Sequence, residues 1–189
     1  MFNIYIKIKL EYCSIVWSPV QQTLIYELEK IQKTFTKKIK GMEELDYHQR
    51  LKSLGMYSLE RRRDRYMIIY GWQQLEGLKE NVLKLKASSR DTGRTIIPIK
   101  PPFSVEGRRL GTANKTTIYN GPSSKVQRLF NCLPRRLRNM TGVSTDTFKG
   151  HLDRWLQTVP DQPKSPAYSG RVAADTNGVI HQVRFSTGR

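Results

Sequence analysis

Apolar residues recur with helical spacing in several separate stretches of the chain. In the longest stretch they follow one another at intervals of four and three residues, at Leu24, Leu28, Ile31, Phe35 and Ile39. This spacing puts the side chains on one face of a helix. Ser18 and Pro19 are suited to begin that helix, and Gly41 is suited to end it. The pattern therefore predicts an amphipathic helix over about 20–40.

Local start signals predict further helices. Asp46 and Gln49 form a capping-box pattern in front of a short helix over about 47–54. Ser58 is placed to cap a longer helix over about 59–76. Towards the C-terminus the expected helices cover about 123–132, 134–139 and 146–158.

Three stretches have a different pattern. The first ten residues, MFNIYIKIKL, alternate apolar with mostly polar side chains, which is typical of a strand. Prolines, glycines and the polar run ASSRDTGR favour loop or extended structure over 87–123, with a short edge strand at 95–99. From residue 160 the chain is polar and contains prolines, which favours a flexible tail with a weak helix near 171–182.

These elements predict a mainly α fold: a small helical bundle with an irregular Pro/Gly-rich middle segment and a flexible C-terminal tail. A chain of 189 residues suits one domain, or one domain with tails. The expected segments are an atypical N-terminal segment at 1–10, a helical basic region at 11–86, a loop or extended linker at 87–123, a second helical segment at 124–159 and the tail at 160–189.

The charge of the chain limits the classes of partner that it is expected to bind. Lys and Arg number 33 against 16 Asp and Glu, which gives a net charge of +17. The excess is concentrated in three windows, 30–65, 84–115 and 125–154. Basic clusters interleaved with aromatic residues are the usual electrostatic footprint of RNA or DNA binding. The alternative is that these clusters are solvated surfaces that only keep the chain soluble.

The strongest basic cluster lies at the start of the helix predicted over 59–76. Four arginines there are unfavourable, because a helix N-terminus already carries partial positive charge. They indicate either an anionic partner or an acidic surface elsewhere in the protein. The candidate phosphate contacts are Lys33, Lys37, Lys38, Arg61, Arg62, Arg63, Arg65, Arg135, Arg136 and Arg138.

Aromatic residues near these clusters could stack on bases or build the core. Tyr47 and Tyr57 fit either role. Trp17, Phe35 and Trp155 stand at apolar helix positions or at a cap, so we expect them in the core.

The sequence contains few residues that could form a catalytic, metal-binding or cofactor-binding site. No Asp-Asp pair and no Gly-rich phosphate loop is present, and His48, His151 and His181 lie far apart. We therefore predict no catalytic residue, metal site or cofactor. No apolar run is long enough to span a membrane, so we expect no membrane partner. Two cysteines without motif spacing fit an intracellular protein, nuclear or cytoplasmic.

Several short motifs follow one another in the chain. They are YCSIVWSP at 12–19, LEKIQKTFTK at 28–37, YHQRL at 47–51, SLERRRD at 58–64, LFNCLP at 129–134, and Phe148-Lys149 with LDRWL at 152–156. Their order and spacing resemble the region after the polymerase core in reverse transcriptases of non-LTR, LINE-type, Jockey-like retrotransposons. The resemblance runs from about 11 to 163, which is most of the chain.

The resemblance implies a place in the thumb and C-terminal region of an RNA-directed DNA polymerase. It implies a grip on RNA template, primer or heteroduplex, whereas the metal-binding aspartates belong to an upstream domain. We therefore expect a truncated, reverse-transcriptase-like chain that binds RNA or DNA through backbone electrostatics and is not an enzyme. Its partners would include the missing polymerase domain.

Two other interpretations remain open. The stripe of Leu24, Leu28, Ile31 and Phe35 has heptad-like spacing, so the chain could be a protein-interaction module that pairs with a helical partner. MFNIYIKIKL differs from the usual lead into this region of the family. The chain could therefore also be a retrotransposon remnant without a function.

Overall fold

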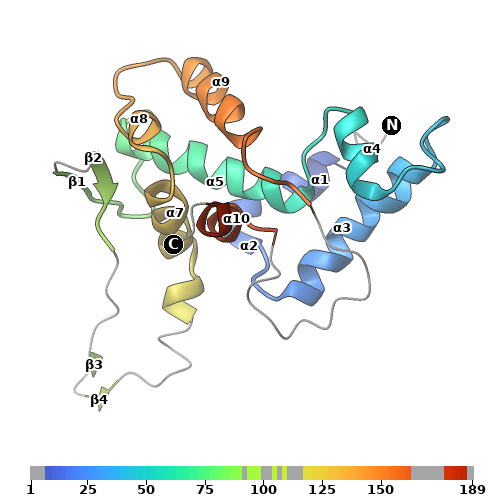
Figure 1. The fold of residues 1–189 in the computed structure, drawn as a ribbon. Coiled ribbons are helices and arrows are strands. Elements are labelled where there is room, and N and C mark those ends of the chain that lie inside the picture. Colours follow the sequence, from blue (N-terminus) through green and yellow to red (C-terminus); the bar gives the residue numbers. More distant parts are fainter. Residues whose placement is uncertain are drawn as a thin grey trace. The chain divides into compact units, whose positions relative to one another are not determined.

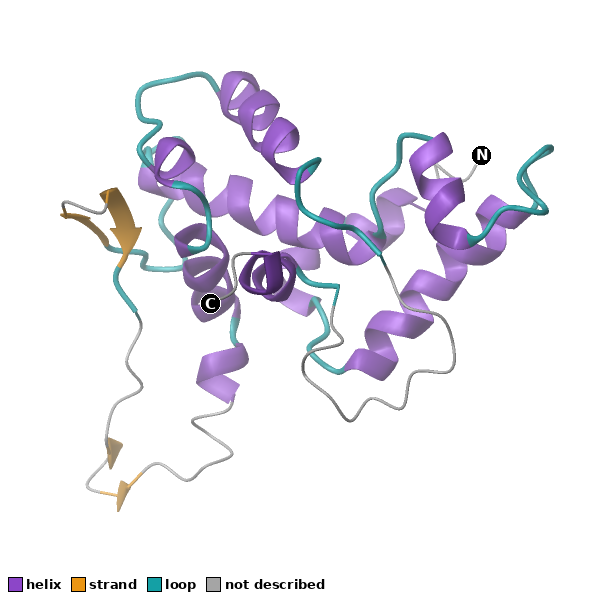
Figure 2. Cartoon of the chain, in the orientation of Figure 1, coloured by secondary structure: helices purple, strands orange, loops and turns teal. Residues whose placement is uncertain are grey.

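Helices make up most of the computed structural model of the chain (Figure 2). The structure describes residues 7–90, 93–98, 104–105, 108–109, 117–162 and 177–186. The prediction of a mainly α fold with irregular segments is confirmed. The chain forms two compact units. Unit 1 comprises residues 1–66 and 157–189, and unit 2 comprises residues 67–156.

Unit 1 is helical wherever it has regular structure among its described residues. Its elements, coloured along the chain in Figure 1, are α1 (Lys7–Glu11), α2 (Ser14–Trp17), α3 (Gln22–Lys37), α4 (Tyr47–Ser53), the first turns of α5 (Leu59–Leu75) and α10 (Val179–Ser186). The strand predicted for the first ten residues is wrong from Lys7 onward, because α1 begins there. Residues 1–6 lie outside the described residues. A strand needs a partner, and the described part of unit 1 contains none.

Of two helix starts predicted in unit 1, one is confirmed and one is wrong. Asp46 Oδ1 accepts from Gln49 N at 2.8 Å, and Gln49 Oε1 accepts from Asp46 N at 3.0 Å, so the predicted capping box is confirmed. The predicted start of the first long helix is wrong. Ser18 instead follows α2 and donates its N–H to Ser14 O, and α3 begins at Gln22.

Backbone N–H groups around the start of α5 all donate to side-chain oxygens. Asp161 accepts from Ser58 N at 2.9 Å. Glu29 accepts from Leu59 N at 3.0 and 3.1 Å, and from the N–H of the next residue at 3.4 Å. Ser58 Oγ accepts from Arg61 N at 3.1 Å, as its predicted capping role requires. The orphan donors of this helix start are thus satisfied by two carboxylates and a hydroxyl.

Residues near the C-terminal end of unit 1 also form hydrogen bonds at the start of α5. Asn177 Nδ2 donates to Asp161 Oδ1 at 2.7 Å and to Ser58 Oγ at 3.1 Å. Val179 N donates to Asp64 Oδ2 at 3.0 Å. Within the predicted tail, α10 (Val179–Ser186) forms and overlaps the end of the weak helix predicted near 171–182. The rest of that prediction, over 163–176 and 187–189, lies outside the described residues.

Unit 2 combines helices with short hairpins. After the remainder of α5 come β1 (Ala87–Arg90), β2 (Gly93–Ile96), β3 (Ser104–Val105), β4 (Arg108–Arg109), α7 (Pro122–Asn131), α8 (Arg135–Arg138) and α9 (Thr145–Leu156). β1 and β2 pair antiparallel, with Ala87 opposite Ile96, and β3 pairs antiparallel with β4. The predicted edge strand is therefore present as far as Ile96. Where it is described, the middle segment carries these hairpins, helical residues at 117–120 and the start of α7.

The core of unit 2 is built around Trp72 on α5. Its ring stacks on Phe148 of α9 with the ring centres 4.4 Å apart, and its Nε1 donates to Met140 O at 2.8 Å. Asn131 at the end of α7 binds both backbone groups of Ile96 at 2.8 Å, which fixes β2 to the helices. The amide of Asn131 thus forms the two hydrogen bonds that a further strand would make with Ile96.

Close helix packing in unit 2 generates a stability prediction. A Cβ added at Gly71 of α5 would lie 2.4 Å from Cγ1 of Val126, a stiff side chain that is fully buried. We expect Gly71→Ala to lower the free energy of unfolding by about 1–3 kcal/mol, because overpacking outweighs the gain in helix propensity. Urea denaturation measures the change.

The matched control is Gly150→Ala in α9, where a Cβ would have nothing within 4 Å. We expect this variant to be neutral or up to about 1 kcal/mol more stable, because alanine favours the helix. Equal effects at the two glycines would contradict the packing described.

Candidate functional site

The arginines at the start of α5 are committed to unit 1 itself. Arg61 is fully buried and donates to Val159 O at 3.1 Å and to Pro160 O. Arg63 is 3% exposed, and its charge acts on the buried carboxylate of Glu29. Burial removes both guanidinium groups from the predicted phosphate contacts, because a polyanion outside the fold cannot reach them.

The other two arginines of this cluster are also engaged. Arg62 forms an ion pair with Glu11 of α1, and Arg65 is half-buried and has an interaction partner. The sequence left open whether the cluster faces an anionic partner or an acidic surface. In the structure two acids of unit 1 meet this cluster: Glu11 pairs with Arg62, and the buried Glu29 feels the charge of Arg63.

Glu29 is the most unusual ionisable group in this region. Burial raises the pKa of its carboxyl. The Tyr47 hydroxyl, which donates to Glu29 Oε1 at 2.5 Å, opposes the rise, as do the Leu59 N–H and the charge of Arg63. Burial and the neighbouring Glu29 also raise the pKa of Tyr47. Tyr47 is therefore a buried partner of Glu29, and its ring is not available for stacking on bases.

The lysines predicted as phosphate contacts lie near the end of α3. Lys37 and Lys38 are exposed, and Lys33 is half-buried with an interaction partner. They remain candidates for electrostatic contact with a polyanion.

The predicted arginines of α8 divide into two kinds. Arg138 donates from Nε to Leu133 O and from Nη1 to Arg94 O, each at 2.9 Å. Desolvation and the charge of Arg135 lower its pKa, and its bonds tie α8 to β2. Arg135 and Arg136 are exposed.

A basic cavity of about 400 Å³ lies between α8 and α9 in unit 2. Its lining residues, which define the α8–α9 pocket, are Arg136, Leu137, Met140, His151 and Arg154. Arg154 Nε donates to Gly150 O at 3.3 Å, which holds that side chain along its own helix. Two arginines and a histidine thus line this cavity together with the buried Leu137. Such a donor set suits a phosphate group.

His151 and Arg154 were not among the predicted phosphate contacts. A signal for them was present, since residues three apart on the helix predicted over 146–158 share a face. The sequence did not show that this face meets Arg136 of α8, because that meeting depends on how α9 packs in unit 2.

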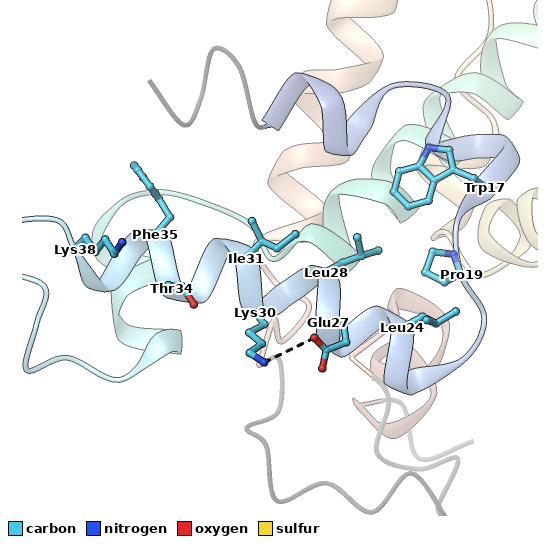
Figure 3. Close-up of a pocket in the computed structure, with 10 residues that line it drawn as sticks. All are labelled: Trp17, Pro19, Leu24, Glu27, Leu28, Lys30, Ile31, Thr34, Phe35 and Lys38. Carbon is cyan, nitrogen blue, oxygen red and sulfur yellow. Dashed lines mark ion pairs between the residues drawn. The ribbon is translucent and has the colours of Figure 1, made fainter.

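A second cavity, of about 850 Å³, follows α3 in unit 1 (Figure 3). We define the α3 groove by its lining residues Trp17, Pro19, Leu24, Glu27, Leu28, Lys30, Ile31, Thr34, Phe35 and Lys38. The expected core positions of Trp17 and Phe35 are not confirmed. Trp17 is 38% exposed and Phe35 is half-buried in the groove, whereas Trp155 is buried as expected.

Two other kinds of feature are absent from the described residues. In that part of the chain no three His, Cys, Asp or Glu side chains gather closely enough to hold a metal ion. None of the helices described is long and apolar enough to cross a membrane.

Comparison with known proteins gives no relative for this chain. No protein-family model, no curated protein and no solved structure matches it.

The buried Arg61 should contribute to the stability of the protein. We expect Arg61→Ala to lower the free energy of unfolding by about 3 kcal/mol, because two backbone carbonyls of the C-terminal segment lose a charged donor. Arg136→Ala is the matched control and should change it by less than about 0.5 kcal/mol, since that side chain is exposed. Chemical denaturation of the two variants checks this, and an unchanged stability in Arg61→Ala would refute the structural role.

The raised pKa of Glu29 predicts how stability varies with pH. A carboxyl with a raised pKa in the folded protein binds its proton more tightly there than in the unfolded chain. Its stabilising contribution is therefore full below its ordinary pKa and is lost as the pH rises through the folded value. We expect the stability of the parent protein relative to Glu29→Gln to fall with rising pH above about 4.5. Urea titrations at several pH values measure this difference, and a difference that grows with pH would mean that the hydrogen-bond donors outweigh burial.

Proposed function

We propose that the chain binds RNA or DNA through the phosphate backbone, with the α8–α9 pocket as a principal contact. The observation that carries the proposal is the pocket itself, in which exposed Arg136 and Arg154 from two different helices lie beside His151. Arginine presents donors in a planar fork that fits phosphate oxygens, and its charge persists at any physiological pH.

The charge of the whole chain supports the same proposal. A net charge of +17 draws polyanions to the protein and accelerates their association. The exposed Lys37 and Lys38 on unit 1 and Arg135 on unit 2 add to this attraction. Backbone contacts of this kind position a nucleic acid without selecting its sequence. We therefore propose binding with little sequence preference.

We further propose that the chain derives from the post-palm region of a LINE-type reverse transcriptase and acts by binding rather than by catalysis. The order of the short motifs supports this origin. Several residues that carry the resemblance also hold the fold together. Ser58 and Arg61 fix the start of α5, and Asn131 fixes β2. A chain with the same fold would need residues of this kind at these positions.

The test is titration of the purified chain into labelled RNA, DNA and RNA–DNA hybrid over a range of salt concentrations. We expect affinity to fall steeply with salt, and the double variant R136A/R154A to reduce the slope of log affinity against log salt on duplex DNA by about 1.8, since each lost phosphate contact contributes about 0.9. A preference for the hybrid would support the polymerase origin.

The matched control is K52A/K86A, which removes the same charge from two other exposed positions. We expect this control to weaken binding less and to leave the slope closer to that of the parent chain. Equal losses in the two double variants would remove the α8–α9 pocket from the proposal, and an affinity independent of salt would refute it as a whole.

A further inference from the structure

Helix α3 buries a largely polar stripe, whereas its apolar stripe is half-buried or exposed. The residues that face the inside of unit 1 are Ile25, Glu29, Gln32 and Thr36. The neighbouring stripe of Leu24, Leu28, Ile31 and Phe35 lies in the α3 groove, where Leu24 is 51% and Ile31 is 40% exposed. An ordinary surface helix has the opposite arrangement.

The buried polar stripe cannot be exchanged for the apolar one within this fold. Glu29 accepts from Tyr47 and from the start of α5, and Gln32 Nε2 donates to Tyr57 O at 3.0 Å. Thr36 Oγ1 accepts from Arg50 Nε at 3.2 Å. Rotating α3 about its axis would break all of these bonds and leave buried charge unpaired. Leu24 and Ile31 of the apolar stripe therefore stay exposed.

The geometry of the α3 groove fits a helix. Figure 3 shows Leu28, Ile31 and Phe35 projecting from one side of α3 with Trp17 of α2 nearby, whereas Glu27 and Lys30 project from the other side. Intervals of four, three and four residues are those of a coiled-coil seam over about three helical turns. Helix-in-groove recognition uses anchors with the same spacing.

The charges around the groove decide which helix fits. Lys30, Lys37 and the C-cap Lys38 are exposed on α3, against Glu27 as the exposed acid of that helix. A second copy packed parallel to α3 would bring like charges together along the seam, and each copy carries +17. An acidic helix would instead meet complementary charge, most strongly at the Lys37–Lys38 end.

We propose that the α3 groove binds an amphipathic helix of an acidic partner protein, antiparallel to α3. In that direction the N-terminal turn of the partner lies beside Lys37 and Lys38. Acidic residues are stabilised in the first turn of a helix by its dipole, so the same residues favour both the partner helix and the contact. This interaction surface is separate from the α8–α9 pocket, and its test does not depend on nucleic-acid binding.

The experiment measures binding of a labelled peptide to the full chain by fluorescence anisotropy. The peptide has about 14 residues, leucines at the seam positions and glutamates in its N-terminal half. A second peptide carries the glutamates in its C-terminal half, and a third carries lysines in their place. We expect the first peptide to bind at least roughly tenfold more tightly than either of the others. Equal or tighter binding of the second or third peptide would overturn the proposal.

Two double variants of the chain test whether the α3 groove is the surface that binds the peptide. L24E/I31E places charge on two exposed groove positions, and we expect it to weaken the first peptide at least roughly tenfold. L78E/V82E makes the same charge change at two exposed apolar positions of unit 2 and should leave binding within about twofold, because it lies outside the groove. Because the altered side chains are exposed, circular dichroism should show the parent helix content in both variants. Equal weakening in the two variants would refute the groove as the binding surface.

Two further measurements separate the possible occupants. The charge reversal K30E/K38E should weaken the first peptide and strengthen the lysine peptide, an exchange that loss of structure cannot produce. Sedimentation equilibrium should give a monomer. A dimer that L24E/I31E dissociates would assign the groove to a second copy of the chain and overturn the proposal.

Discussion

The start of α5 is the interaction on which unit 1 depends. Two carboxylates, Glu29 and Asp161, accept its backbone N–H groups, and Arg61 and Arg63 supply positive charge from inside the same helix. Arginine at a helix N-terminus is unfavourable by itself. Here the acceptors come from distant parts of the chain, so the helix start, the buried arginines and the acids form one mutually compensated group. The unit is therefore held by this polar centre as well as by apolar packing.

Local signals in the sequence predicted the elements well, and long-range contacts explain what they missed. The capping box of Asp46 and Gln49 and the cap at Ser58 involve residues three positions apart, so the sequence contains the whole interaction. Arg61 looked like a phosphate contact, because its acceptors at Val159 and Pro160 lie far along the chain. A basic cluster in a sequence does not distinguish a surface from a buried network. That distinction needs the positions of the acids.

The same limit applies to α3. Periodicity correctly predicted a helix with an apolar stripe, but it did not show which stripe the fold buries. The choice is made by Glu29, Gln32 and Thr36, whose partners lie on α4, on α5 and between them. Apolar burial and polar satisfaction therefore favour different faces of one helix, and the fold satisfies the polar groups. The α8–α9 pocket was similarly beyond the sequence, since its two halves meet only through packing.

The bonds between Ser58 and Asp161 also constrain the order in which the protein can form. They join residues 103 positions apart, and all of unit 2 is encoded between them. During synthesis unit 2 can complete its core while unit 1 still lacks Asp161 and Asn177. Until Asp161 and Asn177 are made, Ser58 lacks its hydrogen-bond partners from the C-terminal part of unit 1. The polar network of unit 1 can therefore close only after the whole of unit 2 has been synthesised.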